Sequence, residues 1–266
     1  MIQIKKLSNN RFAELRKLKQ KKIRRETNIL LGEGLRLLKA AIAAESIISE
    51  LLLSQKLLES AVGNDIEKLA RSNAIPLTVC GESQIRAIAD DVTPPGILFL
   101  VKGQFNRDLS RLQTCRDYII LYLDKISEPG NLGVILRSAR WFGIETILLS
   151  PGSVDLYNPK VIRASAGAIF SCQIYPDAEF ARVDPILRRN GYKFWATATA
   201  NGCSIHKWNP AEKNVIFFGS EATGLSPEIL AQCDQSVTIP GAGGIESLNL
   251  AVSAGIVFFQ LTDKGR

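Results

Sequence analysis

The chain has 266 residues, of which 46% are hydrophobic and 22% charged, a mixture typical of globular proteins with one or two domains. Its five cysteines are scattered without a CxxC pair, which argues against a disulfide framework and a zinc site. No apolar run approaches the ~18 residues of a membrane span, and the charged N-terminal residues do not resemble a secretion signal. We therefore expect a cytoplasmic protein with no metal and no membrane association.

The formal net charge of +7 is concentrated in the first residues of the chain. Residues 1–25 carry ten basic side chains and one acidic residue, Glu14, whereas the rest of the chain carries 23 basic and 25 acidic side chains. Such a cationic block gives salt-dependent affinity for a phosphate backbone. The alternative is a solvated helix that only aids solubility. The local charge density favours a polyanionic partner.

Alternating helices and strands predict a small α/β domain over residues 1–103, which includes the basic segment. Within that segment Phe12, Leu15, Leu18 and Ile23 have helical spacing. An apolar run broken by two glycines follows at 28–34. We then predict helices over 35–45, 57–71 and 82–89, strands over 47–53, 75–80 and 97–102, and a polar linker over 103–117.

The second half repeats this alternation and predicts a parallel α/β domain over residues 117–266. Its first strand, 118–123, is continuously apolar, as in strands that are buried on both faces of a parallel sheet. Further strands are predicted at 146–149, 193–198, 214–218 and 236–239, and helices at 131–142 with Asn131 as a candidate N-cap, 158–170, 179–190, from Ser226, and 248–261. The last helix is so apolar that we expect it to be buried.

Three loops rich in Gly, Asn, Glu and Ser directly follow predicted strands, over 124–133, 218–226 and 239–249. Each loop alone is explained by a turn and a helix cap, but three of them favour a ligand site, because open parallel sheets bind ligands at the carboxyl ends of their strands. A dinucleotide site is excluded because the third loop lacks G-x-G-x-x-G and only 22 residues follow Gly244. A P-loop sequence is absent, and the single histidine, His206, argues against hydrolase and metalloenzyme chemistry.

In this order the loops resemble the three signature motifs of the SpoU/TrmH family of RNA 2′-O-ribose methyltransferases, within the SPOUT superfamily. The first motif, an acidic residue followed by P-x-N-x-G-x-I-x-R-[ST]-A, corresponds to residues 128–139. The second, G-[NS]-E-G-x-G-[LI], corresponds to 219–225 with Ala222 in place of a glycine. The third, I-P-M-x-G-x-x-[ED]-S-L-N-[VL], corresponds to 239–250 with Gly241 in place of methionine. These departures remove no charged or amide group, and we expect them only to adjust cofactor affinity.

The N-terminal half is similar to the family's small RNA-binding domain, which has a ribosomal-protein-like α/β fold, through the basic run followed by residues 28–38. The whole resemblance implies a C-terminal trefoil knot, a homodimer through the C-terminal domain, and S-adenosyl-L-methionine as cofactor. It implies methyl transfer to a ribose 2′-hydroxyl of RNA, with ribosomal RNA favoured because such domains accompany ribosomal substrates in the family. A transfer-RNA methyltransferase and a non-catalytic RNA-binding protein that retains the fold stay open as alternatives.

The residues that match the motifs are the candidate site. The implied catalytic residues are Arg137, Asn131, Glu221, Ser247 and Asn249; the cofactor contacts are Gly219, Ile239, Leu248, Leu225 and Gly243; and the RNA contacts in the basic segment are Lys19, Lys21, Lys22, Arg24 and Arg25. The family assigns activation of the ribose hydroxyl to the arginine of the first motif, with help from an RNA phosphate. Because arginine is effectively always protonated, stabilising the forming alkoxide is the easier role for Arg137.

Overall fold

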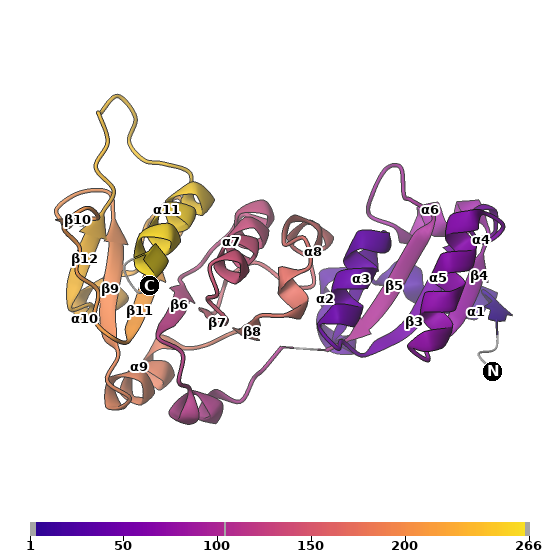
Figure 1. The fold of residues 1–266 in the computed structure, drawn as a ribbon, viewed down its shortest axis with the longest axis horizontal. Coiled ribbons are helices and arrows are strands. Elements are labelled where there is room, and N and C mark those ends of the chain that lie inside the picture. Colours follow the sequence, from indigo (N-terminus) through magenta and orange to yellow (C-terminus); the bar gives the residue numbers. More distant parts are fainter. Residues whose placement is uncertain (1–3, 104, 264–266) are drawn as a thin grey trace. The chain divides into compact units, whose positions relative to one another are not determined.

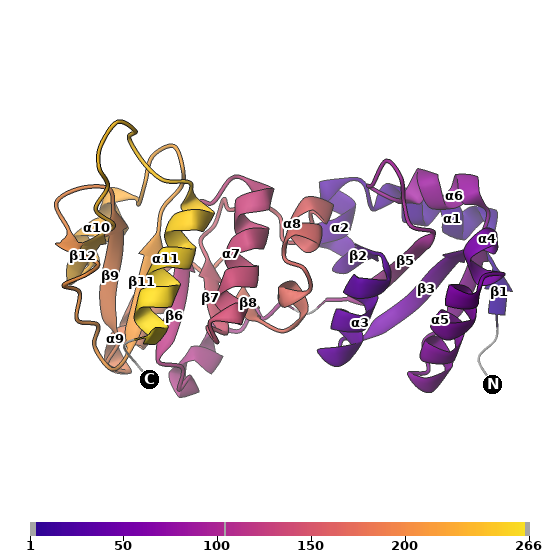
Figure 2. The ribbon, with the colours of Figure 1, turned by 45° about the horizontal axis from the view of Figure 1, so that its top comes forward.

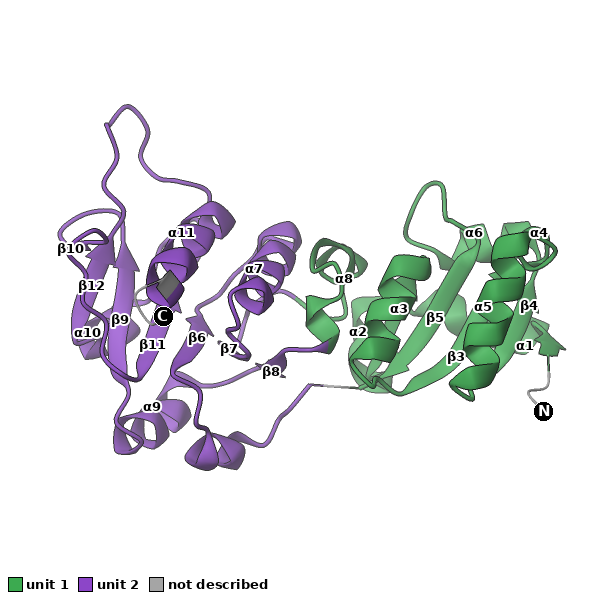
Figure 3. Ribbon diagram, viewed as in Figure 1, with its two compact units in different colours: residues 1–104, 155–170 green, residues 105–154, 171–266 purple. Residues whose placement is uncertain are grey.

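The structure is a computed structural model that describes residues 4–103 and 105–263, and the chain forms two compact units (Figure 1). Unit 1 comprises residues 1–104 and 155–170, and unit 2 comprises residues 105–154 and 171–266 (Figure 3). Residues 1–3 and 264–266 of the predicted domains, and residue 104 of the predicted linker, lie outside the described residues. No helix in the described ranges is long and apolar enough to cross a membrane.

Unit 1 contains a mixed five-stranded sheet in the order β1-β4-β3-β5-β2. Strand β4 is parallel to β1 and β3, and β5 is antiparallel to β3 and β2. The strands are β1 (Ile4–Lys6), β2 (Ile29–Glu33), β3 (Ile48–Ser54), β4 (Leu77–Cys80) and β5 (Ile97–Lys102). Strands β3, β4 and β5 confirm the predictions, whereas β1 and β2 were not predicted. Gly32 is accommodated in β2 because Phe99 on β5 fills the space beside it, 2.2 Å from where a Cβ would lie.

The helices of unit 1 include two from the second half of the chain. They are α1 (Asn9–Lys17), α2 (Lys21–Thr27), α3 (Leu35–Ala43), α4 (Gln55–Leu58), α5 (Ala61–Ser72), α6 (Glu82–Ile88), α8 (Pro159–Ala164) and the 3-10 helix η2 (Ala168–Phe170). The predicted helix over 57–71 is divided because Ser60 caps α5 by accepting a hydrogen bond from the Gly63 N–H. The predicted helix over 158–170 ends at Ala164, since Ala166 and Gly167 have positive φ angles of 49° and 101°.

Unit 2 is built on a seven-stranded sheet in the order β10-β12-β9-β11-β6-β7-β8, and every pair of neighbours is parallel. This confirms the predicted parallel α/β fold. The strands are β6 (Ile119–Leu123), β7 (Thr146–Leu149), β8 (Gln173–Tyr175), β9 (Lys193–Ala198), β10 (Cys203–Ser204), β11 (Asn214–Phe218) and β12 (Gln235–Thr238). All five residues of β11 are buried, as expected for a central parallel strand.

Helices cover both faces of the sheet in unit 2. They are η1 (Leu109–Thr114), α7 (Pro129–Trp141), α9 (Phe180–Arg189), α10 (Pro227–Gln232) and α11 (Leu250–Asp263). Helices α7 and α11 lie side by side (Figure 2), and Phe258 of α11 packs on Phe218 of β11. The opposite face carries an aromatic core in which Phe217 contacts Tyr122 and Phe194, and Phe180 of α9 contacts all three rings. The trefoil knot remains an expectation that follows from the family.

Two local predictions for unit 2 are corrected. The N-cap of α7 is Glu128, whose carboxylate accepts a hydrogen bond from the Asn131 N–H, so Asn131 lies inside the first turn with its side chain available for other contacts. Helix α11 is only partly buried: Ala254 and Phe258 are inaccessible to solvent, but Val252 and Phe259 are 52% and 58% exposed. One apolar face of α11 is therefore open in the single chain.

Candidate active site

The three motif loops lie at one edge of the sheet in unit 2. Strands β6, β11 and β12 belong to the same parallel set, so their carboxyl ends face the same way. The loops that leave these ends are residues 124–128, 219–226 and 239–249. Parallel topology thus brings the first loop to the same edge of the sheet as two loops that lie more than ninety residues further along the chain.

Asp124 joins the first two loops at their base. It is 2% exposed, its backbone N–H donates to the carbonyl of Phe218, and its Oδ2 accepts from the Ser226 N–H at 2.9 Å. A carboxylate this buried needs such donors, because an unpaired buried charge is costly. Asp124 therefore fixes where the second loop leaves β11 and returns to α10.

The second loop folds back on itself as a short hairpin. Ser220 and Gly224 exchange backbone hydrogen bonds of 3.1 and 2.9 Å, and Gly224 has φ +68°. Gly219 permits this turn, since a Cβ there would lie 2.1 Å from the carbonyl carbon of Gly224 and from the backbone nitrogen of Leu225. The hairpin presents Glu221 at its exposed tip.

A chain of side-chain hydrogen bonds connects all three loops. Asn131 donates from Nδ2 to Oε1 of Glu221 at 2.8 Å and accepts at Oδ1 from Nδ2 of Asn249 at 3.0 Å. The Oδ1 of Asn249 accepts from the first N–H groups of α11, on Ala251 and Val252. We call the set Asn131, Glu221 and Asn249 the polar triad. Its amide orientations are determined, because each amide oxygen has a donor and each amide nitrogen an acceptor.

The other two predicted catalytic residues lie outside the triad. Arg137 is exposed on α7 and has no hydrogen-bond or ion-pair partner among the residues that the structure describes. It shares one face of α7 with Val134 and Trp141, at helical spacings of three and four residues. Ser247 is exposed in the third loop and makes no hydrogen bond with the described part of the chain. Arg137 is therefore a free cation at the edge of an apolar helix face.

The predicted cofactor contacts combine apolar side chains with an unpaired backbone. Ile239 and Leu225 are half-buried, and Leu225 packs against the aromatic core, whereas Leu248 is 41% exposed. In the third loop the N–H groups of residues 241–248 donate to no other described residue, and Gly243 and Gly244 have φ angles of +87° and +91°. Free backbone donors next to apolar side chains suit a nucleoside, whose base has flat apolar faces and a polar edge.

The predicted RNA contacts divide into four exposed cations and one buried one. Lys19, Lys21, Lys22 and Arg25 are exposed around the turn between α1 and α2, and we call these four residues the cationic corner. Arg24 is only 6% exposed and its guanidinium is bonded to Asp155, Leu18 and Lys19 within unit 1. This burial corrects the expectation that Arg24 contacts RNA.

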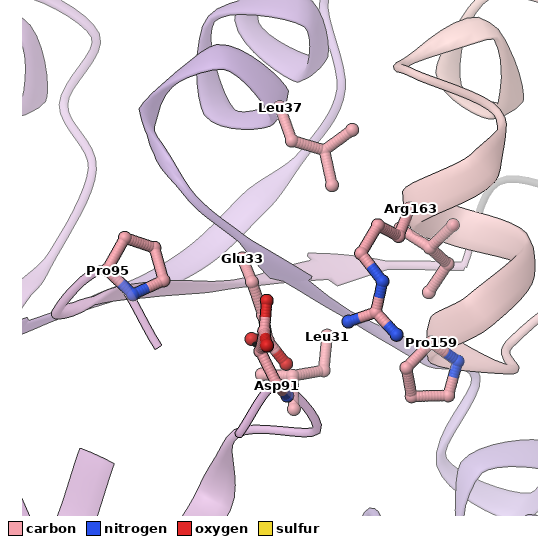
Figure 4. A pocket seen from close by; sticks show the side chains of 8 residues that line it. Leu31, Glu33, Leu37, Asp91, Pro95, Pro159 and Arg163 are labelled. Atoms are coloured by element: carbon pink, nitrogen blue, oxygen red, sulfur yellow. Dashed lines mark hydrogen bonds between the residues drawn. The ribbon is translucent and has the colours of Figure 1, made fainter. Parts of the chain in front are cut away.

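A small cavity of about 80 Å³ lies in unit 1. Glu33 and Asp91 face Pro159 and Arg163 of α8 across it (Figure 4). Burial raises the pKa of Glu33, although its carboxylate also accepts hydrogen bonds from the N–H groups of Asp90 and Asp91. None of the residues lining the cavity belongs to the predicted site.

Sequence reasoning missed two polar residues in the first loop. Ser127 donates to Oε2 of Glu221 at 3.3 Å, so both oxygens of that carboxylate have a donor, and Asp124 is the buried anchor described above. The position of Asp124 directly after a continuously apolar strand was an available signal. Ser127 offered none, because its partner is 94 residues away in the chain.

Comparison with known proteins identifies the class. Residues 118–259, more than half of the chain, match the SpoU rRNA Methylase family, and residues 9–98 match the MRM3-like substrate binding domain. The chain belongs to the SpoU rRNA Methylase family. The family prediction made from the three motifs is confirmed, and with it the class of enzyme, an RNA methyltransferase.

Particular relatives cover most of the chain. It is 29% identical to the 23S rRNA (guanosine(2553)-2′-O)-methyltransferase RlmP of Bacillus subtilis, over 98% of this chain and 99% of that protein. It is 33% identical to an uncharacterized tRNA/rRNA methyltransferase of Archaeoglobus fulgidus, over 75% of this chain and 84% of that protein. Its fold matches the crystal structure of an AdoMet-bound rRNA methyltransferase from Sinorhizobium meliloti with a TM-score of 0.85 and 24% identity, over 99% of this chain and 98% of that one.

Proposed function

We propose that this protein transfers a methyl group from S-adenosyl-L-methionine to a ribose 2′-hydroxyl of ribosomal RNA. The observation that carries the proposal is the polar triad, which ties the three family motifs into one site at the carboxyl edge of the sheet. The Bacillus subtilis relative, which acts on 23S rRNA and aligns over nearly the full length of both proteins, supports the substrate class.

The second and third motif loops form the proposed cofactor site. The apolar side chains of Leu225, Ile239 and Leu248 would hold the adenine, and the free N–H groups of residues 241–248 would bind its polar atoms. Gly219 and Gly243 keep the backbone free of side chains there. When bound, the cofactor supplies a methyl group attached to a sulfonium sulfur. That sulfur departs as a neutral thioether and needs no acid.

The protein's own task is to make a nucleophile from a ribose hydroxyl, whose pKa lies far above neutrality. We assign Arg137 the stabilisation of the forming alkoxide and the positioning of the adjacent RNA phosphate, while the proton of the hydroxyl passes to water. Arg137 is suited to this because no described carboxylate neutralises it. Asn131, Glu221, Ser247 and Asn249 would position the ribose and the cofactor relative to that cation.

We further propose a homodimer through unit 2. Val134 and Trp141 on α7 are 41% and 84% exposed, and Val252 and Phe259 on the neighbouring α11 are 52% and 58% exposed. Apolar side chains gathered on two adjacent helices favour a covered surface in the assembled protein. Arg137 lies on the same face of α7, so a second copy seated there would lie beside the proposed catalytic cation.

RNA would bind unit 1 through the cationic corner, whose four exposed side chains supply phosphate contacts. Arg24 is left out of this set because it is buried. Ribosomal RNA is favoured over transfer RNA by the match of residues 9–98 to a substrate-binding domain and by the Bacillus subtilis relative. We place the protein in the cytoplasm, where its five free cysteines would stay reduced.

Two measurements test the proposal. S-adenosyl-L-methionine is expected to raise the melting temperature in proportion to the logarithm of its concentration, because a true cofactor site stabilises the fold by mass action. Tritium from the labelled methyl group is then expected in ribosomal RNA and not in transfer RNA. RNA binding without a thermal shift would identify a non-catalytic binding protein, and label in transfer RNA alone would identify the other substrate class.

A further inference from the structure

Residues 155–170 lie within the part of the chain that matches the methylase family, yet they complete unit 1. Phe170 packs against Phe99 of β5, with ring centroids 6.2 Å apart. Gly167 is held against α3, where a Cβ would lie 2.5 Å from the Cβ of Ala40. Arg163 of α8 lines the cavity (Figure 4) and forms an ion pair of 3.1 Å with Asp90. Unit 1 therefore depends on side chains from the second half of the chain.

The most buried charged contact of this segment is an ion pair between Asp155 and Arg24. The two side chains are 4% and 7% exposed, and Nη2 and Nε of Arg24 donate to Oδ2 of Asp155 at 2.9 and 3.2 Å. The second oxygen of Asp155 accepts from the Tyr157 N–H and lies 3.8 Å from Nε of Arg25. Asp155 is thus fully engaged, and its charge faces two consecutive arginines of α2.

Arg24 also binds the turn between α1 and α2. Its Nη1 donates to the carbonyls of Leu18 and Lys19 at 3.0 and 2.8 Å. These carbonyls follow the last turn of α1, where they would otherwise lack partners. One planar guanidinium thereby fixes α2, the turn and residue 155 to one another, a geometry that only arginine can provide.

The residues held in this way are the cationic corner itself, since Lys19 lies in the turn and Lys21, Lys22 and Arg25 lie on α2. We infer that Asp155 is a positioning residue for the RNA substrate, which acts through Arg24 to hold the cationic corner in the arrangement that contacts phosphates. This inference rests on the proposed function, because it takes the corner as the RNA contact. Asp155 itself, buried and paired, does not touch RNA.

Electrostatics alone makes the opposite prediction. Removing any carboxylate from a polyanion-binding unit raises its positive charge and should strengthen RNA binding. The positioning role predicts weaker binding, because loss of the Asp155 charge releases Arg24 and lets the four cations adopt many arrangements. The sign of the change in affinity therefore separates the two explanations.

The experiment compares Asp155→Asn with the matched control Asp65→Asn in the full chain. Asp65 is an exposed carboxylate of α5 whose only described ion pair is with Lys68 of the same helix, 3.6 Å away. For each protein we would measure binding of a 23S rRNA transcript across salt concentrations, the KM for RNA and kcat of methyl transfer, and the Kd for S-adenosyl-L-methionine.

We expect Asp155→Asn to raise the Kd and KM for RNA several-fold and to reduce the slope of log affinity against log salt by about 1 for each phosphate that the variant no longer binds. We expect kcat at saturating RNA and the Kd for the cofactor to stay as in the wild type. Asp65→Asn should bind RNA as tightly as the wild type or more tightly. Equal or tighter RNA binding by Asp155→Asn overturns the inference, and so does a loss of kcat or cofactor binding with an unchanged KM.

A second variant covers the case in which Asp155→Asn does not fold, since it leaves a buried arginine without its counter-ion. Arg24→Lys keeps the charge and the pairing with Asp155, but the donors of an ammonium all sit on one nitrogen, whereas Arg24 reaches Asp155 through Nε and Nη2 and the two carbonyls through Nη1. The same rise in KM is expected, and unchanged RNA binding would overturn the inference. If the wild type itself neither binds RNA nor transfers methyl groups, the proposed function fails; if it does both and the variants match it, only this inference fails.

Discussion

The side-chain amide of Asn131 donates to Oε1 of Glu221 across 2.8 Å, although the two residues are 90 positions apart in the chain. Asn249 donates to the same Asn131 from the third loop, and its own oxygen caps α11. Hydrogen-bond polarity therefore runs in one direction, from the N-terminus of α11 through two amides to a carboxylate. Each motif loop is held by the other two, and this preorganisation is what the proposed chemistry requires.

Reversing one hydrogen bond of the triad tests that polarity. Asn131→Asp places a carboxylate against Glu221, so the donor is removed and two like charges repel. We expect methyl transfer to fall by about a hundredfold, comparable with the loss of one positioned donor in an enzyme site. Adding Glu221→Gln restores a donor facing an acceptor, and the double variant should regain part of the activity. An additive loss in the double variant would show that the two residues do not act as a pair.

Arg137→Ala removes the proposed catalytic cation from an exposed position with no described partner. The fold and cofactor binding should be unaffected, while methyl transfer should fall by about a thousandfold, as expected when a stabilising charge is removed from a transition state. Melting temperature with and without S-adenosyl-L-methionine supplies the control. Near-normal turnover would remove Arg137 from the chemistry.

Charge placed on the open face of α7 and α11 tests the proposed dimer. Trp141→Asp and Phe259→Asp each put a carboxylate into an apolar surface that a second copy would cover. Light scattering after size exclusion should show half the wild-type mass, and methyl transfer should fall with it. Val92→Asp, at an apolar side chain that is 90% exposed in unit 1, is the matched control and should leave the mass unchanged. A wild-type protein that is already a monomer would contradict the proposal.

Stability at acid pH should depend on Asp234. Burial acts to raise the pKa of this carboxyl, but the Phe194 N–H and the Arg188 guanidinium, which donates at 2.6 Å, together hold it below the ordinary value of 3.8. Its contribution is therefore complete above pH 3.8 and is lost as the pH falls through the lower folded-state value. Because the pair is partly exposed, Asp234→Asn should reduce the free energy of unfolding at neutral pH by only about 1 kcal/mol.

The unfolding experiment for Asp234 uses urea at several pH values. The difference between the wild type and Asp234→Asn should shrink towards zero in strong acid, where both side chains are neutral. Glu212→Gln, at an exposed carboxylate with no described partner, should be as stable as the wild type throughout. A difference that grows as the pH falls would contradict the assigned direction of the pKa shift.

Sequence patterns predicted the elements whose stability is local or whose burial is complete. Strand β6 is continuously apolar because both faces of the parallel sheet are covered, and this is visible in the sequence from residue 119 to 123. Strand β2 was not predicted, because a glycine such as Gly32 is typical of a break in a strand. The ring of Phe99, far away in the sequence, explains why this strand has a glycine there. The short edge strand β1 was not predicted, because all three of its residues are exposed and give no pattern of burial.

The sequence predicted which residues belong to the candidate site, but it did not predict the hydrogen bonds between them. The motif spacing placed Asn131, Glu221 and Asn249 in loops, while their mutual hydrogen bonds depend on strand order in the sheet. The sequence predicts Arg24 to be a surface cation, because nothing local reveals its partner, Asp155, which is 131 residues away. The sequence predicts Asn131 as a candidate N-cap because Asn is common at that position. In the structure Glu128 makes the capping contact, and the Asn131 amide is left to bind Glu221.

The most direct test of the central claim is the chemical position of the transferred methyl group. Ribosomal RNA methylated by the purified wild-type protein with labelled S-adenosyl-L-methionine would be hydrolysed in alkali, which needs a free 2′-hydroxyl to cut the adjacent phosphodiester. We predict that the label is recovered in an alkali-resistant dinucleotide. Label recovered in mononucleotides would mean that a base is methylated and would contradict ribose 2′-O-methyl transfer.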